Sequence, residues 1–320
     1  MDLIYTNADR VDLGVLSSHA FDLSYGASEN DFELTLGADE PALAGGAYIY
    51  MEGTEYGGIV GGIKTNSSSE TITYNGRTWH GVINSKVIEP DNGENYLVVS
   101  GEANELLSML IARLGLSGLF VAAEEHSGVT IKKYQFNRYC KGYDGIRDML
   151  GENGAKLRIK WQNRSVVLSA EPVADYTDDP IDGDTADLSV EQQKQKVNHI
   201  VCLGRGELSK REVIHLYVDQ FGRIGDVQYY FGMDEITDIY ENTNAESSEE
   251  LRNGGISRLK ELRNGDKAKV SVPETARVYD IGDIVGANEM KSGISVSAAV
   301  TQKIVKINNG AVRIEYKTGG

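Results

Sequence analysis

The sequence predicts a β-dominated α+β protein in which two β-rich ends flank a middle α+β segment. Two patterns support this class. Short runs rich in β-branched and aromatic residues alternate with glycine-rich connectors, first over about one hundred residues and again at the C-terminal end. Near Ser100 the apolar spacing changes from the strand period to the helical period. With 320 residues, 40% of them hydrophobic, the chain can form two or three domains.

The first β domain is expected over residues 1–98. Its clearest strand is DFELTL, where Phe32, Leu34 and Leu36 point one way and the acids point the other. Connectors rich in glycine, serine or asparagine separate the predicted strands. Further strands are predicted at Phe21–Tyr25, Ala47–Met51, Gly58–Ile63 and Thr71–Tyr74.

The stretch NGRTWHGVINSKVIEP, from Asn75 to Pro90, predicts a hairpin. Asn-Gly between strand-like runs favours a tight turn, because both turn positions take positive φ. The returning strand is expected at 77–83, with Trp79 facing the core. His80 then lies on the opposite face, at a subunit contact or a channel.

A middle α+β domain is expected over residues 99–175. A first helix starts at Ser100 or Gly101 and ends at Gly115, and a second covers Tyr143–Leu150. KLRIKW and SVVLSA then form a hairpin joined by Gln162-Asn163-Arg164. The apolar face of the first helix consists of Leu106, Leu107, Leu110, Ile111 and Leu114.

Residues 176–192 are predicted to be an acidic linker, because the chain has no Lys or Arg between Arg164 and Lys194. The sequence DDPIDGD matches the calcium-binding loop of an EF-hand only in part. Asp178 and Asp182 fit the first and fifth positions of an EF-hand, but the third would be proline and the twelfth Ser189. An EF-hand is therefore excluded, whereas another kind of cation site remains open.

A second β domain is expected over residues 193–320, with one helix near 247–263. Ser247 can cap this helix, and Gly254-Gly255 weakens it by about 1 kcal/mol per glycine, so that a break is an alternative. Asn309-Gly310 predicts another hairpin. Strands are expected at Val197–Leu203, Glu212–Val218, Val227–Phe231 and, entered through a Gly-Asp turn, Asp280–Val285.

No motif predicts catalysis. The chain lacks the Gly-Lys of a Walker loop, HExxH and GxSxG. The glycines of GGIVGG, Gly57–Gly62, fit a β-bulge or close strand packing better than phosphate binding. His199 and His215 can meet across a sheet, and Cys140 and Cys202 are expected to be reduced thiols. We therefore predict no catalytic residue, no cofactor and no metal site.

The charge and hydropathy restrict the partners. A net charge of −16 and a pI of about 4.8 disfavour specific nucleic-acid binding. The mean hydropathy is −0.33, and no apolar run approaches the ~20 residues of a membrane span, so we expect no membrane insertion. The N-terminus MDLIYTNADR does not look like a signal peptide, which favours synthesis in a cytoplasm without export.

Taken in order, five segments resemble the short tail hub proteins, also called tail-associated or baseplate hub proteins, of siphophages and prophages of Gram-positive bacteria. None is a catalytic motif, and together they span most of the chain. They are YIYMEGTEYGGIVGGI (Tyr48–Ile63), YNGRTWHGVINSKVIEP (Tyr74–Pro90), YLVVSGEANELL (Tyr96–Leu107), VNHIVCLGRGELSKREVIHLY (Val197–Tyr217) and YDIGDIVGA (Tyr279–Ala287).

The resemblance implies two tail-tube-like β-barrel domains with an α/β insertion, and a homotrimeric ring at the virion tail tip, made in the host bacterial cytoplasm. The implied partners are the distal tail protein, the tape measure protein and tail-tip or fibre proteins. DNA would pass through the central channel at ejection, and an acidic channel wall would repel it. Because the sequence stops at KTGG, we expect no enzymatic tip on this polypeptide.

Two alternatives remain open. A tail-associated cell-wall hydrolase or endopeptidase would need a nucleophile or metal constellation. A receptor- or carbohydrate-binding tail module would be favoured if the 17 tyrosines gathered in a surface cleft.

Overall fold

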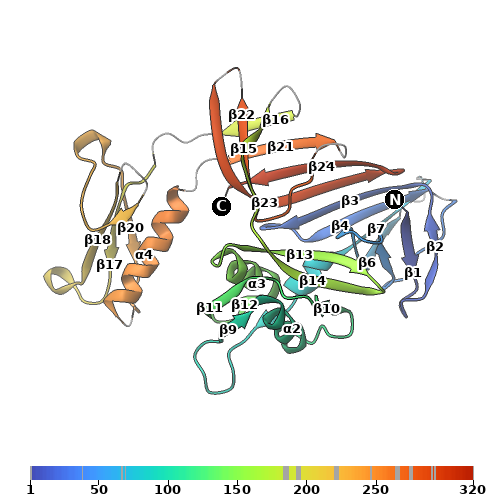
Figure 1. The fold of residues 1–320 in the computed structure, drawn as a ribbon, viewed down its shortest axis with the longest axis horizontal. Coiled ribbons are helices and arrows are strands. Elements are labelled where there is room, and N and C mark those ends of the chain that lie inside the picture. The colour runs from blue at the N-terminus through green and yellow to red at the C-terminus, as the bar shows by residue number, and fades with distance from the viewer. Residues whose placement is uncertain are drawn as a thin grey trace. The chain divides into compact units, whose positions relative to one another are not determined.

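The residues form two compact units, which are described separately below (Figure 1). The computed structural model describes residues 2–37, 39–65, 68, 70–182, 187–191, 196–219, 223–245, 247–263, 267–273, 277–289, 291 and 293–319. Unit 1 comprises residues 1–189 and 268–318, and unit 2 comprises residues 190–267 with 319–320. This division differs from the expected domains, because the C-terminal strands belong with the N-terminal ones.

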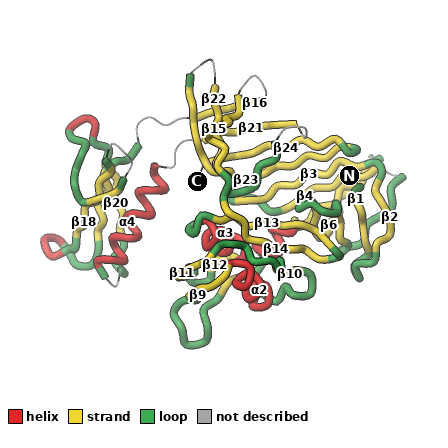
Figure 2. The backbone as a smooth tube through the Cα atoms, in the orientation of Figure 1, coloured by secondary structure: helices red, strands yellow, loops and turns green. Residues whose placement is uncertain are grey.

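Among the described residues of unit 1, thirteen strands form one curled sheet (Figures 1 and 2). Its main path runs β16-β21-β24-β23-β3-β4-β7-β6-β5-β1-β2, and β22 joins β15 to β23. The strands are β1 (Leu3–Thr6), β2 (Asp12–Leu16), β3 (His19–Gly26), β4 (Asp31–Gly37), β5 (Tyr48–Tyr50), β6 (Gly57–Thr65), β7 (Thr71–Thr78), β15 (Asp175–Asp182), β16 (Asp187–Glu191), β21 (Lys267–Pro273), β22 (Ile284–Glu289), β23 (Ile294–Asn308) and β24 (Ala311–Thr318).

Strand β23 joins the two ends of the chain. It pairs antiparallel with β3, so that Lys303 lies opposite Tyr25 and Val305 opposite Leu23. The predicted hairpin at Asn309-Gly310 is confirmed and returns the chain to β24. The strands expected in separate domains, 1–98 and 193–320, therefore share one sheet.

The period-2 prediction for β4 is confirmed: Phe32, Leu34 and Leu36 are buried, whereas Asp31 and Glu33 are exposed. Strand β3 follows the same alternation, and its Phe21 ring packs edge-on against Phe32 at 5.5 Å between centroids. One face of the sheet thus supplies the core.

The segment between β7 and β15 forms the predicted α+β part of unit 1. Both predicted helices and the hairpin around Asn163 are confirmed, and Asn163 and Arg164 both take positive φ. Glu102, rather than Ser100, caps the longer helix. The elements are α1 (Trp79–Asn84), β8 (Val87–Ile88), β9 (Val98–Glu102), α2 (Ala103–Arg113), β10 (Phe120–Ala122), β11 (Thr130–Gln135), β12 (Cys140–Lys141), α3 (Gly142–Gly151), β13 (Ala155–Gln162) and β14 (Ser165–Pro172).

The prediction of a hairpin at Asn75-Gly76 is wrong. Strand β7 runs straight through both residues and pairs with β4 on one side and β6 on the other. Gly76 serves close packing instead: a Cβ there would lie 2.0 Å from the Ile59 carbonyl oxygen and 2.6 Å from Phe32 Cζ. The predicted role of the GGIVGG glycines is confirmed, since β6 carries a bulge between Val60 and Gly62.

The returning strand predicted at 77–83 is also wrong, because helix α1 begins at Trp79. The Thr78 side chain caps it by accepting a hydrogen bond from the Gly81 N–H at 3.3 Å. A helix turns successive side chains by 100° rather than 180°, so Trp79 and His80 are both buried. Trp79 is the predicted core anchor, and it stacks on Trp161 with 5.2 Å between centroids.

The acidic stretch 176–192 is not a loop where the structure describes it, because β15 and β16 lie within it. Strand β15 pairs parallel with β22, and its Ile181 is buried. Arg277, distant in sequence, pairs with Asp179 at 2.7 Å and lies over the Tyr176 ring. The linker prediction considered only the charges within the stretch itself, so it could not include this arginine.

Unit 2 is a four-stranded sheet, ordered β19-β18-β17-β20, with helix α4 on one face (Figure 1). The helix is confirmed, with Ser247 accepting from the Glu250 N–H at 3.2 Å, and it does not break at its glycines. The elements of unit 2 are β17 (His199–Leu203), η1 (Leu208–Lys210), β18 (Val213–Val218), β19 (Ile224–Gly225), η2 (Gly232–Asp234), β20 (Thr237–Glu241) and α4 (Ser248–Arg263).

Close contact explains the glycines of α4. A Cβ at Gly254 would lie 2.3 Å from the Tyr240 hydroxyl, and one at Gly255 would lie 2.2 Å from Cys202 Sγ. The strand expected at Val227–Phe231 is wrong, because these residues form a loop in which both named side chains are exposed. None of the helices in the described ranges is both long and apolar enough to cross a bilayer.

Replacing Gly76 by alanine should destabilise unit 1 by about 3 kcal/mol or more, because its Cβ would overlap a backbone carbonyl that cannot move without breaking the β6–β7 ladder. Thermal unfolding measures the loss. Gly45→Ala is the matched control, since nothing lies within 4 Å of its Cβ. Equal midpoints for the two variants would show that the close approach at Gly76 is not required.

Candidate functional site

Unit 1 contains a buried ionic cluster, which we call the Lys303 cluster. Lys303 of β23 is 1% exposed, and its ammonium pairs with Glu55 from the β5–β6 loop and lies 3.9 Å from Asp280 Oδ1. Lys156 of β13 donates to Asp280 at 2.9 Å and to Asp283 at 2.8 Å. The cluster therefore joins the N-terminal strands, the α+β segment and the C-terminal strands.

The charges of the cluster stabilise one another. Burial alone would lower the pKa of the Lys303 ammonium, but Glu55 and Asp280 hold it above its ordinary value. Burial would likewise raise the pKa of the Asp280 carboxyl, but Lys303 and Lys156 hold it below its ordinary value. Asp283 also accepts from the Ala174 and Asp280 backbone N–H groups, which fixes the turn entering β22. This turn is the predicted Gly-Asp turn.

His80 lies beside the cluster rather than at a subunit contact or a channel. Its ring stacks on Tyr25 at 4.2 Å between centroids and meets Tyr143 edge-on. Burial and the Lys303 charge lower the pKa of His80 to about 3. The Glu55 carboxylate lies 3.6 Å from His80 Nε2 but is already bound to Lys303, so it does not keep a proton on the imidazole.

A second polar cluster lies on the sheet of unit 2, where the predicted meeting of His199 and His215 is confirmed. His199 Nε2 lies 2.8 Å from His215 Nδ1, and His199 Nδ1 lies 2.7 Å from Glu235 Oε1. The carboxylate orients the buried ring, while His215 is exposed. Sequence reasoning missed Glu235, because it comes from the loop before β20, 36 residues away.

Among the described residues, the contacts of this histidine pair do not complete a hydrolytic or metal site. Thr237 Oγ1, the hydroxyl near His199, lies 3.1 Å from the nitrogen that Glu235 also contacts. Within the described ranges, no three or more His, Cys, Asp or Glu side chains converge as metal ligands. Cys202 is buried against α4, and burial raises the pKa of its thiol and of the half-buried Cys140 thiol, which makes both poor nucleophiles.

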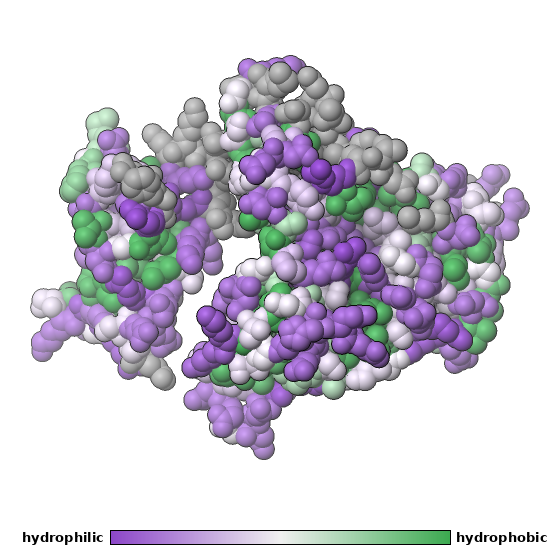
Figure 3. Space-filling view, viewed as in Figure 1, coloured by the Kyte–Doolittle hydropathy of each residue, from purple (hydrophilic) through white to green (hydrophobic). Residues whose placement is uncertain are grey.

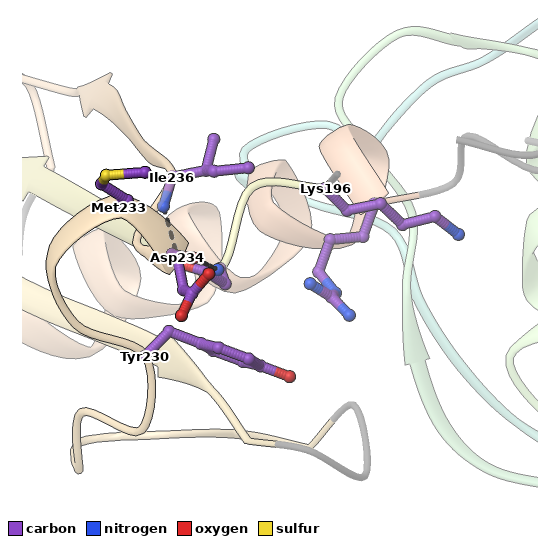
Figure 4. A pocket seen from close by; sticks show the side chains of 7 residues that line it. Lys196, Tyr230, Met233, Asp234 and Ile236 are labelled. Atoms are coloured by element: carbon purple, nitrogen blue, oxygen red, sulfur yellow. Dashed lines mark hydrogen bonds between the residues drawn. The ribbon is translucent and has the colours of Figure 1, made fainter. Parts of the chain in front are cut away.

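Unit 2 also carries a cavity of about 290 Å³ (Figure 4). Tyr230, Met233 and Asp234 come from the loop before β20, and Figure 4 shows Lys196 across the cavity from Met233. The Asn198 amide fixes this loop by donating to the Asp234 carbonyl and accepting from the Ile236 N–H. The described lining carries two cations, Lys196 and Arg263, and one carboxylate, Asp234.

The large sheet of unit 1 has an exposed apolar edge at β2. Strand β2 ends the main path of the large sheet, and its Leu13 and Val15, with Val11 just before it, are each about half exposed. Hydrophobic patches are visible over this part of the surface in Figure 3. Unpaired apolar edge strands tend to pair with another chain.

Replacing Lys303 by methionine should lower the free energy of unfolding by about 3–5 kcal/mol, because Glu55 loses its buried partner while its desolvation cost remains. Chemical denaturation measures the change. Lys306→Met is the control, since Lys306 lies on the same strand but is exposed. Similar losses in both variants would contradict the role assigned to the cluster.

His80 should make unit 1 sensitive to acid. Its folded pKa of about 3 lies below the unfolded value of 6.5, so its contribution is complete above pH 6.5 and is lost as the pH falls toward 3. At pH 4.5 the loss is about 3 kcal/mol. His80→Phe keeps a ring on Tyr25 and should flatten the stability profile between pH 6.5 and 4.5. His126→Phe, at an exposed site, should leave the profile unchanged. An unaltered slope in His80→Phe would refute this assignment.

Solved phage tail proteins have a fold similar to that of this chain. A tail protein from Neisseria meningitidis MC58 aligns with 100% of this chain and 96% of its own, at a TM-score of 0.59 and 12% identity. The 43 kDa tail protein of prophage MuSo2 from Shewanella oneidensis aligns with 99% of this chain and 98% of its own, at a TM-score of 0.60 and 11% identity. A chain of the phage P2 baseplate aligns with 100% of this chain and 99% of its own, at a TM-score of 0.50 and 10% identity. No protein-family model matches the sequence, and no curated protein is significantly similar to it. The chain has the fold of phage tail proteins.

Proposed function

We propose that this chain is a structural protein of a phage or prophage tail, acting as a hub at the tail tip. The observation that carries the proposal is the full-length match to tail proteins, which covers nearly all of both chains in each comparison. One matched structure is a baseplate, which favours the tip over other tail positions. The segments that resemble Gram-positive siphophage hubs point to the same position.

In this proposal three copies form a ring, and the curled sheet of unit 1 is its tail-tube-like part. The sheet is open, with β2 at one end of its path and β16 at the other. Leu13 and Val15 on β2, with Val11 just before it, suit this edge to contact a second copy, because the contact would cover an exposed edge strand. A net charge of −16 suits a channel wall that repels DNA.

The hub would link the distal tail protein and the tape measure protein to tip or fibre proteins, and it would not be an enzyme. The acids of the Lys303 cluster are held in ion pairs with buried lysines, which suits a structural role. The rival carbohydrate-binding function loses support from the tyrosines. Nine of the 17 are buried in the core, where they cannot line a surface cleft.

Light scattering with particle imaging tests the proposal. We expect a mass of about 105 kDa, three times the 35.0 kDa of one chain, and three-fold rings. Leu13→Lys with Val15→Lys should dissociate the ring without unfolding the monomer, because both side chains are already exposed there.

Val98→Lys with Val121→Lys, at exposed sites on other strands, is the matched control and should leave the ring intact. A protein that stays monomeric at its highest soluble concentration and degrades purified cell walls would contradict the hub and support the hydrolase.

A further inference from the structure

A cavity of about 320 Å³ in unit 1 combines an apolar floor with a cationic rim. It lies between the β5–β7 strands, the end of α1 and the loop between α2 and β10. Its floor includes Tyr48, Val60 and Phe120, which are 9%, 3% and 1% exposed. Its rim carries Arg10, Arg77 and Lys86, and no aspartate or glutamate occurs among the described residues that line it.

Three cations without a carboxylate are unexpected in this chain, which has 48 acidic and 32 basic side chains. Two other arginines of unit 1 have acidic partners: Arg113 pairs with Asp91, and Arg158 with Glu171. Within the described residues, neither Arg77 nor Lys86 makes an ion pair, although both are exposed. The rim therefore keeps its charge available for an anionic group from outside.

Arg10 is held in place before anything binds. Its guanidinium donates to the Gly118 carbonyl and lies 5.5 Å from the centre of the Tyr48 ring. Its backbone has φ +66°, and its carbonyl accepts from Arg164 at 2.9 Å. Because these contacts fix the side chain between β1 and the α2–β10 loop, binding costs little further conformational entropy.

We propose that this cavity binds an acidic peptide segment of a partner protein, with an apolar side chain on the floor and flanking carboxylates against Arg77 and Lys86. The volume admits one large side chain or two small ones. The buried floor at Tyr48 and Phe120 favours a peptide, because one apolar side chain can fill the cavity while neighbouring carboxylates meet the cationic rim. The inference rests on the proposed function and deepens it by giving the chemistry of one partner segment.

The test uses the full chain and a fluorescein-labelled peptide, Asp-Asp-Leu-Phe-Asp-Asp, with blocked ends. Fluorescence anisotropy should show saturable binding with a Kd below about 1 mM that weakens with salt. Two comparison peptides separate the contributions: one replaces each Asp by Asn, and the other replaces Leu-Phe by Ser-Ser. Both should bind about tenfold or more weakly.

The variant Arg77→Glu with Lys86→Glu should reduce the affinity by about tenfold or more. The matched control Lys132→Glu with Lys133→Glu makes the same charge change at exposed positions of β11 and should bind as the unaltered chain does. Thermal unfolding checks that the variants are folded. Lys86→Glu alone, in the exposed turn after α1, keeps the test decisive if Arg77→Glu disturbs β7.

Absence of peptide binding, or equal loss in both double variants, would overturn the inference. Displacement of the peptide by an equally charged oligothymidylate would assign the cavity to nucleic acid instead. These outcomes are independent of the ring, because binding is measured per chain. A ring without peptide binding rejects this inference alone, and peptide binding by a monomer that degrades purified cell walls rejects the hub alone.

Discussion

The pairing of the buried Lys303 ammonium with Glu55 and Asp280 is the interaction on which unit 1 depends. Glu55 belongs to the N-terminal strands and Asp280 to the turn before β22. Through Asp280 and Asp283 the network reaches Lys156 in the α+β segment. A buried ion pair adds little stability over an apolar substitute, but each partner becomes costly when the other is absent. The network therefore favours the one arrangement in which all three parts of the chain meet.

This constraint explains why unit 1 is built from distant segments. β23 must lie against β3 for Lys303 to reach Glu55, and that pairing extends the N-terminal sheet with the C-terminal strands. His80, stacked on Tyr25 beside the cluster, stays neutral because its burial, and secondarily the nearby Lys303 charge, lower its pKa.

Local patterns predicted local structure well. The helices at α2, α3 and α4, the alternation in β4 and the Asn309-Gly310 turn were all readable, because each depends on residues a few positions apart. The hairpin prediction at Asn75-Gly76 was wrong because this glycine is needed for close packing against Phe32 and Ile59 on neighbouring strands, not for a turn. The prediction of an exposed linker at the acidic stretch was wrong because a contact distant in sequence was again involved: Arg277 pairs with Asp179. The contact of Glu235 with His199, and the cationic rim of the unit 1 cavity, likewise depend on tertiary contacts that sequence spacing does not encode.

The central claim is that the chain sits at the tip of a tail. Gold-labelled antibodies against unit 2, applied to intact tail particles that contain this chain, test it most directly in the electron microscope. The account predicts gold at the end of the tail farthest from the capsid. Gold spaced along the tube, or at the junction with the capsid, would contradict a hub.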